Sequence, residues 1–443
     1  MLGEYRIEGS GAAEIAASVE RAVGSGELEP GQLLPPMREL AARLGVNPNT
    51  VAAAYRTLRE RGVIETAGRR GSRIRSKPAT TGRDHIRVEV PDGVRNLADG
   101  NPDRALLPGL AEAFAVAVEG SDRKPVMYGE AAVEPELVRL ARAELDADSV
   151  PDGPVVVTSG SLDAIERVLV THLKPGDAVA VEDPGWGSLL DLVPALGLRV
   201  VAIRVDDEGP EPADVRRALD AGTRALIVTS RAQNPTGAAV TATRARALRS
   251  VLEKYPQTLL IEDDHGHRIV DLPLHPLAGT THHWALVRSV AKAYGPDLRL
   301  AVLTGDPVTV DRVHGRQRLG PGWVSHLLQR AVVHLWANGA VDVPAVAASY
   351  ERRRDALIGA LEERGVAAQG RSGLNVWIPV PDETGAVARL LHAGWAVAPG
   401  ARFRMSAPPG LRITVSTLTP GDIEPLADAV ASAVAQAPAR HYV

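Results

Sequence analysis

Short apolar runs alternate with helix-forming segments between residues 155 and 263, and this alternation constrains the fold more than any other feature of the chain. The apolar runs have the length of strands and lie at residues 155–158, 178–182, 198–205, 225–230 and 258–263. Helical segments follow the first two runs, as far as residues 173 and 196. Such alternation is typical of an α/β domain with a mainly parallel sheet, helices on both faces and ligands at the carboxyl ends of the strands.

The chain of 443 residues is long enough for two or three domains. After about residue 342 the pattern becomes α+β, with a long helix expected at 343–365 and strands near 375–380 and 411–416. Residues 77–95 are polar, contain proline and glycine and lack a sustained period, which is typical of a linker. The expected domains are a head at 1–76, a linker at 77–95, a large α/β domain at 96–342 and a small α+β domain at 343–443.

Composition excludes several classes of protein. The longest apolar stretches, such as 155–157 and 225–228, are much shorter than a membrane span, and the N-terminus shows no charged region followed by an apolar one. We therefore expect a cytoplasmic protein. The chain contains no cysteine, which excludes disulfides, thiolate metal sites and a cysteine nucleophile, and no metal site is expected.

The net charge of −4 hides a basic segment near the N-terminus. Between residues 38 and 77 ten basic residues stand against three acidic ones, a local charge of +7, so the rest of the chain carries −11. Such a segment fits binding to a phosphate backbone, since each neutralised phosphate releases a counterion. A solvated basic face without a ligand is equally consistent with the charge alone.

Three amphipathic helices are expected in the same region. Their apolar positions recur at helical spacing and are Ile15, Val19 and Val23; Met37, Leu40, Ala41 and Leu44; and Val51, Ala54, Tyr55 and Leu58. Between the second and third helices, Gly45 suits a left-handed C-cap, Asn47 an N-cap and Pro48 the first helical position. These residues predict a tight helix-turn-helix.

A two-stranded wing is expected directly after the third helix. Residues 62–65 and 72–74 have strand character and flank residues 68–71, which form a basic tip with Arg69 and Arg70. Arginines at such a tip can reach phosphates or the minor groove of DNA. The alternative interpretation of the head is a helical hairpin with no role in nucleic-acid binding. The wing and its basic tip favour DNA binding over this alternative.

The first 75 residues resemble the GntR family of winged-helix regulators. The matching residues are Ser25–Gly31, Leu34 and Pro35, Arg38–Ala41, Leu44–Val46, Asn49–Val51 and Tyr55–Gly62, in the order and spacing of that family. The resemblance implies DNA contacts from Arg38, Asn47, Asn49, Thr50, Arg56, Arg69 and Arg70. Pro48 and Ala52 depart from the family pattern, since many members have arginines at these positions, so the bases that are read stay undefined.

Chemically useful side chains follow the predicted strands of the second region. The turn at residues 158–161 opens a helix, so its backbone N–H groups and hydroxyls suit a phosphate, although such turns are often purely structural. Asp263 ends a strand, where its carboxylate could pair with a protonated pyridine nitrogen or cap a helix. Lys292 could form an imine with an aldehyde or remain a solvated surface lysine.

Taken together, residues 96–436 resemble the fold-type-I aminotransferases of class I and II, which use pyridoxal 5′-phosphate. The resemblance implies Lys292 as the Schiff-base lysine, Asp263 on the pyridine nitrogen, Asn234 on the ring oxygen and Trp186 stacked on the ring. It also implies phosphate contacts from Ser159, Gly160, Ser161, Ser289 and Arg299. Tyr128 would reach the phosphate of a neighbouring subunit, which implies a homodimer. Arg412 would bind the carboxylate of an effector amino acid, or would pair with a structural acid.

His265 departs from the aminotransferase pattern. The family usually has a tyrosine shortly after the ring-nitrogen aspartate, where its hydroxyl donates to the ring oxygen, whereas this chain reads Asp263-Asp264-His265. An imidazole can bond the same oxygen, but its charge varies near neutral pH. The alternative is that His265 packs in the core or faces water. Cofactor binding is therefore a firmer expectation than efficient transamination.

A GntR-like head joined to an aminotransferase-like body is the architecture of the MocR subfamily of transcription regulators. The resemblance implies a homodimer that binds double-stranded operator DNA, carries pyridoxal phosphate as an imine on Lys292 and senses the cofactor itself or an amino compound. Two other interpretations stay open. The body could be an active aminotransferase with an appended regulatory head, or it could bind no cofactor and only dimerise the head.

Overall fold

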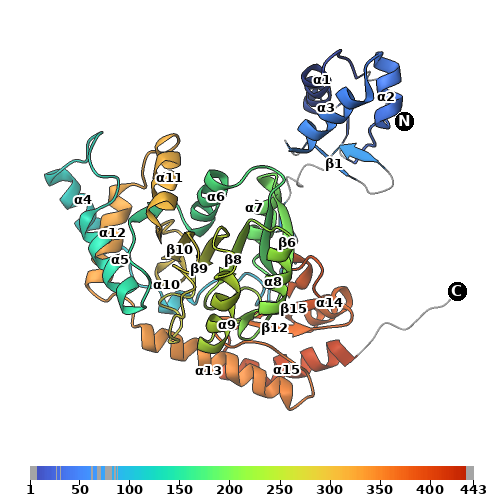
Figure 1. Cartoon of the computed structure of the whole chain (residues 1–443). Coiled ribbons are helices and arrows are strands. Elements are labelled where there is room, and N and C mark those ends of the chain that lie inside the picture. The colour runs from blue at the N-terminus through green and yellow to red at the C-terminus, as the bar shows by residue number, and fades with distance from the viewer. Residues whose placement is uncertain are drawn as a thin grey trace. The chain divides into compact units, whose positions relative to one another are not determined.

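The computed structural model describes residues 7–25, 27–29, 31–60, 63–66, 71–74, 82–83, 86 and 88–435. The chain divides into two compact units, both drawn in Figure 1. The first contains residues 1–82 together with 173–178 and 191–200, and the second contains the remainder. We call residues 1–82 the head and residues 83–443 the body. Arg69 and Arg70, and residues 77–81, 84, 85 and 87 of the expected linker, lie outside the described residues.

The head contains a helix-turn-helix. Its helices are α1 (Ala12–Ser25), α2 (Met37–Leu44) and α3 (Pro48–Glu60). Gly45 ends α2 in the left-handed conformation with φ 67°, and the side-chain oxygen of Asn47 accepts a hydrogen bond from the backbone N–H of Asn49 at 2.8 Å. Both predicted caps are therefore confirmed, and they bring α2 and α3 together across a short turn.

A short hairpin follows these helices. Strands β1 (Ile64–Thr66) and β2 (Ser72–Ile74) pair antiparallel. Ile64 and Ile74 are buried with the apolar faces of α1 to α3, in a core that includes Ile15, Leu40 and Leu58. The Tyr55 hydroxyl, also buried there, donates to the carbonyl of Pro35 at 2.8 Å. Apolar residues from every element thus form one core.

A mixed sheet of eight strands forms the centre of the body (Figure 1). In spatial order the strands are β4 (Val155–Thr158), β11 (Ala301–Gly305), β10 (His283–Ser289), β9 (Leu259–Asp263), β8 (Ala225–Thr229), β5 (Ala178–Asp183), β6 (Arg199–Asp206) and β7 (Gly209–Pro210). The four strands from β10 to β5 run parallel, whereas β11 is antiparallel to both of its neighbours. All five predicted strands are confirmed to within one residue at each end, and β10 and β11 were not predicted.

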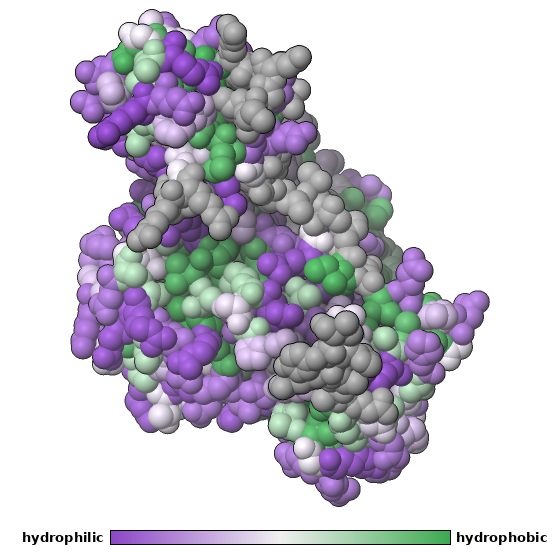
Figure 2. All heavy atoms as spheres, turned by 90° about the vertical axis from the view of Figure 1, so that its right-hand side faces the viewer, coloured by the Kyte–Doolittle hydropathy of each residue, from purple (hydrophilic) through white to green (hydrophobic). Residues whose placement is uncertain are grey.

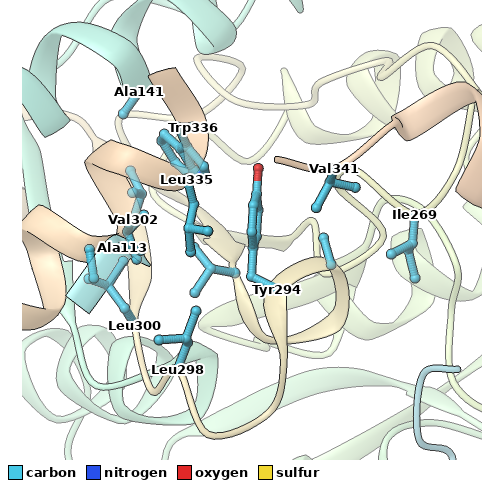
Figure 3. Packing of buried hydrophobic residues seen from close by; sticks show 14 of the residues in the cluster. Ala113, Ala141, Ile269, Tyr294, Leu298, Leu300, Val302, Leu335, Trp336 and Val341 are labelled. Carbon is cyan, nitrogen blue, oxygen red and sulfur yellow. The ribbon is translucent and has the colours of Figure 1, made fainter. Parts of the chain in front are cut away.

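Helices cover the sheet of the body. They are α4 (Ala111–Arg123), α5 (Pro135–Ala147), α6 (Ser161–His172), α7 (Gly187–Ala195), α8 (Pro212–Asp220), α9 (Ala242–Leu252), α10 (Ala291–Tyr294), α11 (Pro307–Arg318) and α12 (His326–Ala337), with a short 3-10 helix at Arg104–Leu106. One apolar cluster joins β8 to α9, through Leu226 and Leu248. Another includes Tyr294, Leu335 and Trp336, and Figure 3 shows them packed closely. These two clusters fix the sheet that carries the site.

The C-terminal part of the body is α+β, as predicted. It contains α13 (Val343–Glu362), β12 (Asn375–Pro379), α14 (Glu383–His392), β13 (Trp395–Ala396), β14 (Ala398–Pro399), a 3-10 helix at Gly400–Arg402, β15 (Gly410–Thr414) and α15 (Pro420–Ala435). Strands β12, β15 and β14 form an antiparallel sheet. Strand β3 (Arg95–Asn96), at the start of the body, pairs parallel with β13.

Hydrophilic side chains predominate on the surface of the head in the view of Figure 2. Among the described residues, no helix combines the length and the apolar character that crossing a bilayer requires.

Candidate functional site

A cavity of about 350 Å³ lies in the body and contains most of the residues expected to hold a ligand. Eight of the predicted site residues line it: Ser161, Trp186, Asn234, His265, Ser289, Lys292, Arg299 and Arg412. Ser159, Gly160 and Asp263 directly adjoin these residues in sequence or in space, whereas Tyr128 does not line the cavity.

Strand direction explains why residues distant in sequence meet here. Register places Asp263 beside Thr229 on one side and Val287 on the other, so the parallel strands β8, β9 and β10 end at the same edge of the sheet. Strand β4 also ends at this edge, because it is antiparallel to β11, which is itself antiparallel to β10. The polar turn that follows each strand therefore faces one cavity.

Lys292 lies on the short helix α10, three residues after the end of β10. Its Nζ donates a hydrogen bond to the carbonyl of Gly100 at 2.8 Å. Burial lowers the pKa of Lys292 to about 8, with a further contribution from the positive charge of Arg412 and an opposing one from Asp263. A substantial fraction of the amine is therefore neutral near physiological pH, which a nucleophilic lysine requires.

Asp263, which is buried, and His265, which is partly buried, form a pair beside the cavity. The imidazole Nδ1 lies 2.9 Å from Asp263 Oδ2, and Nε2 lies 2.8 Å from the carbonyl oxygen of Ala232. Burial disfavours the charged imidazole, but the carboxylate of Asp263 outweighs burial and raises the pKa of His265. Both ring nitrogens are thus engaged by oxygen atoms of the protein, which answers the question of whether His265 faces water.

The turn between β4 and α6 forms a cradle for an anion. Gly160 has φ 101°, and a Cβ atom there would lie 2.8 Å from Nη2 of Arg299, so the close approach of the guanidinium requires glycine. Nη2 of Arg299 donates to the carbonyl of Ser159 at 3.5 Å. Ser161 Oγ is buried and has no hydrogen-bond partner among the described residues. A hydroxyl, a guanidinium and the N-terminus of α6 therefore converge.

Arg412, on β15, extends into the cavity from the C-terminal part of the body. It is buried, its Nη1 donates to Asn234 Oδ1 at 3.1 Å, and its Nη2 donates to the carbonyl of Ala98. The guanidinium carbon lies 4.6 Å from the centre of the Phe403 ring, in a cation–π contact. Because Asn234 accepts through its oxygen, the amide nitrogen is left to donate toward the cavity.

The structure also shows important residues that sequence reasoning missed. Asp264 is fully buried and accepts hydrogen bonds from Arg231 at 2.7 and 2.8 Å and from Arg288 at 3.0 Å. This ion cluster lies directly beside Asp263 in sequence and fixes the end of β9. The sequence did offer one signal, the adjacent pair Asp263 and Asp264. Successive side chains of a strand point to opposite faces, so only one of the two could face the cavity and the other needed a different partner. Gly100, the partner of Lys292, had no comparable signal.

Tyr128 lies in a segment of the body that is exposed and apolar. Its side chain is 92% exposed, and its ring makes an edge-to-face contact with Trp323 at 5.7 Å between centroids. Met127 and Leu319 are exposed as well. Exposed apolar side chains of this kind suit a protein interface.

The residues expected to contact DNA lie on the surface of the head. Arg38 on α2, Asn47 and Asn49 at the start of α3, and Arg56 further along α3 are exposed, and Thr50 is partly buried. Arg69 and Arg70 lie outside the described residues, so the structure adds nothing about the tip of the wing.

Two protein-family models match the chain. The model for bacterial regulatory proteins of the gntR family matches residues 12–74, and the model for aminotransferase class I and II matches residues 92–430. The vitamin B6 salvage pathway transcriptional repressor PtsJ of Salmonella typhimurium is 41% identical over 426 residues, which cover 95% of this chain and 98% of that protein. The pyridoxine biosynthesis transcriptional regulator PdxR of Corynebacterium glutamicum is 32% identical over 279 residues, 60% of this chain and 59% of that protein.

Solved structures agree on the fold of the body. The aspartate aminotransferase of Thermus thermophilus with maleate is 25% identical, with a TM-score of 0.67 over 77% of this chain and 91% of that chain. The kynurenine aminotransferase of Pyrococcus horikoshii is 20% identical, with a TM-score of 0.68 over 80% of this chain and 97% of that chain. The body therefore has the fold-type-I aminotransferase fold, and this fold implies pyridoxal 5′-phosphate as the cofactor.

The donors and acceptors of the cavity fit that cofactor. Asp263 Oδ1 is buried and has no hydrogen-bond partner among the described residues, so it can accept from a protonated ring nitrogen. The unpartnered Ser161 Oγ and the guanidinium of Arg299 can contact a phosphate, and Lys292 supplies the amine that an aldehyde requires. An acceptor, an amine and an anion cradle are the three features that this flat, phosphorylated aldehyde needs.

Proposed function

Because the chain belongs to the MocR-type regulators of the GntR family, we propose that it is a transcription regulator controlled by the pyridoxal phosphate bound in its body. The head would bind operator DNA, and Lys292 would link covalently to the cofactor. The proposal depends most on one observation: Lys292 and Arg412 line one cavity, and beside it Asp263 Oδ1 is buried without a hydrogen-bond partner among the described residues.

The bound cofactor would supply an aldehyde and an electron-poor ring to an incoming amine. Lys292, with its pKa of about 8, would offer a neutral amine to that aldehyde. Asp263 would accept a hydrogen bond from the protonated ring nitrogen, Asn234 would donate its amide N–H to the ring oxygen, and Trp186 would cover one face of the ring. Asp263 is buried, and Lys292 and Asn234 are hydrogen-bonded to neighbouring groups of the protein.

The effector would be pyridoxal phosphate itself or an amino compound with a carboxylate. We expect the effector to carry a carboxylate because Arg412 lines the cavity, and its guanidinium can bind a carboxylate through two N–H groups. PtsJ and PdxR are named for vitamin B6 salvage and pyridoxine biosynthesis, and we propose by analogy that this chain regulates the same metabolism. Genes of vitamin B6 supply are therefore the proposed targets, and the cytoplasm the proposed location.

A route from the cavity to the linker supports a regulatory role. The backbone carbonyl of Ala98 accepts from Arg412, and that of Gly100 accepts from Lys292. The same segment begins at β3, where the described chain leaves the expected linker. When the cofactor binds the Lys292 amine and a carboxylate binds the Arg412 guanidinium, the contacts of these groups with the carbonyls of Gly100 and Ala98 would change. The segment that contains Ala98 and Gly100 would then shift between two conformations, and this change would reach the linker that precedes the body.

We also propose that the protein is a homodimer. The exposed Tyr128, Met127 and Leu319 would be covered by a second copy, and Tyr128 would contribute to the phosphate site of that copy. Two heads in one dimer would read two half-sites of an operator.

An active aminotransferase is the second candidate. The observation that favours it is the joint presence of Lys292, Asp263, Asn234 and Arg412 around one cavity. His265 argues against efficient turnover, because both of its ring nitrogens already contact oxygen atoms of the protein, which leaves neither to donate to the ring oxygen.

A combined spectroscopic and DNA-binding experiment tests these functions. The purified protein should show the absorption band of a covalently linked cofactor, and borohydride should fix that cofactor to the peptide containing Lys292. Lys292→Ala should lose the band, whereas Lys174→Ala, an exposed control on the body surface, should keep it. Binding to the DNA upstream of its own gene should change when cofactor or amino acids are added. If the protein shows the band and rapid transamination but does not bind DNA, the interpretation as an active aminotransferase is supported. If it shows no band, the body binds no cofactor and serves only to dimerise the head.

A further inference from the structure

The two contacts of His265 define where its protons are. The carbonyl oxygen of Ala232 can only accept, so Nε2 must carry the proton of that 2.8 Å hydrogen bond. Nδ1 faces Asp263 Oδ2 at 2.9 Å, a distance that also requires a proton between the two atoms. His265 and Asp263 therefore share one proton in addition to the one on Nε2. A neutral imidazole facing an ionised carboxylate would bring two lone pairs together.

The groups around His265 are consistent with a charged imidazole. Asp263 on β9 favours the charge, and Lys292 on α10 opposes it through its own positive charge. Glu182 on β5 is also near, and it accepts hydrogen bonds from the Thr229 N–H and from Gln233. Burial raises the pKa of Glu182 to about 7, with the charge on His265 opposing that rise.

The other charged groups near His265 contact each other rather than the imidazole. Asp264 is held by Arg231 and Arg288 in the ion cluster described above, and the Trp186 ring lies 6.5 Å from the imidazole without a charge of its own. Asp263 is thus the carboxylate that contacts His265 directly.

We propose that His265 is a positioning residue for the ring nitrogen of the cofactor: its protonated imidazole holds Asp263 Oδ2 and turns Oδ1 toward the cavity. This inference depends on the proposed function, since it assumes that pyridoxal phosphate binds here. It differs from the role that the family pattern suggests for this position, which is a donor to the ring oxygen. In this chain Asn234 is the described side chain that can donate to that oxygen from its place beside Arg412.

Two consequences follow from the shared proton. First, Oδ1 is the free acceptor of Asp263, so removing the imidazole would let the carboxylate rotate and would weaken the contact to the ring nitrogen. Second, Asp263 outweighs burial and raises the pKa of His265 above its ordinary value, so the imidazolium persists to higher pH than in a free histidine and is lost as the pH rises through that raised value. Affinity for the cofactor should fall over the same range.

Binding of pyridoxamine 5′-phosphate measures the effect without the covalent bond to Lys292. Three forms of the full-length protein are compared: wild type, His265→Asn and His265→Phe. The asparagine amide can donate to Asp263 Oδ2 but does not titrate, so we expect wild-type affinity at neutral pH with a weaker pH dependence. The phenylalanine variant should bind roughly 10- to 100-fold more weakly, as expected for loss of a hydrogen bond to a charged group. His282→Asn, on the exposed surface, is the control.

An analogue with C–H in place of the ring nitrogen separates positioning from folding. If His265 acts through Asp263 on that nitrogen, the analogue should bind wild type and His265→Phe with affinities within about threefold. An equal loss for both ligands would show that the substitution only damages the pocket and would overturn the inference. Unchanged pyridoxamine phosphate binding in His265→Phe would also overturn it. Failure of wild type to bind either ligand would instead refute the proposed function.

Discussion

The fully buried side chain of Asp264 offers a quantitative test of what stabilises the site. Arg231 and Arg288 donate three hydrogen bonds to it at 2.7 to 3.0 Å, and both arginines are themselves buried. Asp264→Asn keeps the shape of the side chain but removes the charge that Arg231 and Arg288 face, and Arg288 keeps only its second pair, with Asp148. Removing one partner from a buried ion pair costs about 3–5 kcal/mol, much of it the desolvation of the charge that remains. For residues 83–443, that loss corresponds to a fall in Tm of roughly 4–7 °C.

Thermal and urea unfolding of the cofactor-free protein, followed by circular dichroism, measure this loss. The matched control is Asp152→Asn, because the Asp152 side chain is 98% exposed and its Oδ1 lies 3.9 Å from Nη1 of Arg142. We expect less than about 0.5 kcal/mol of change there. Burial opposes the ionised form of Asp264, but Arg231 and Arg288 hold its pKa well below the usual range. The stabilisation is therefore complete above the ordinary aspartate pKa and is lost as the pH falls. A loss under 1 kcal/mol in Asp264→Asn would refute the reasoning.

Further predictions concern the cavity and the head. The rate of covalent cofactor loading should rise about tenfold between pH 7 and pH 9, because the pKa of Lys292 is about 8, and stopped-flow absorbance measures it. Arg412→Met should move this pH dependence to higher pH, since the Arg412 charge contributes to the lowered pKa of Lys292. Gly100→Ala should weaken binding of an amino-acid effector in calorimetry, because the new Cβ would lie 3.0 Å from Nη1 of Arg412 at a φ of 70°. Arg56→Ala, on the exposed face of α3, should weaken operator binding and reduce its salt dependence while the cofactor spectrum stays unchanged.

Local signals were sufficient to predict much of the fold. Gly45 and Asn47 define the turn of the head because their backbone and capping preferences do not depend on distant contacts. Strand β9 could be predicted because its apolar run is strong and ends in charged residues. Strands β10 and β11 were missed. Their apolar runs, at 284–287 and 300–303, are no shorter than that of β4, but in the described chain no long helix separates β9 from β10 or β10 from β11, so the alternation that marked the other strands ends here. In addition, β11 forms antiparallel pairs whose partners are set by tertiary contacts rather than by local sequence.

The site was predictable as a set of residues but not as a set of contacts. The order of motifs indicated that Lys292, Asp263 and Arg412 belong to one site; Lys292 and Arg412 line the cavity, and Asp263 adjoins it through His265. No pattern indicated that Lys292 would bind the carbonyl of Gly100, because backbone carbonyls carry no sequence signature. For His265, the choice between the ring oxygen, the core and solvent depends on the direction of one side-chain torsion. That direction is set by Asp263 and by the carbonyl of Ala232, which lies 33 positions earlier in the chain.

The charges of the cavity give a physical reason for coupling between effector and cofactor. The positive charge of Arg412 lowers the pKa of Lys292, after the larger effect of burial. A carboxylate bound to Arg412 neutralises that charge, so the pKa of Lys292 must rise and the protonated amine is favoured. Linkage makes the effect reciprocal, since protonation of Lys292 must strengthen carboxylate binding by the same factor. An effector that carries both an amine and a carboxylate can therefore release Lys292 from the cofactor and hold it protonated, whereas a simple amine lacks the second effect.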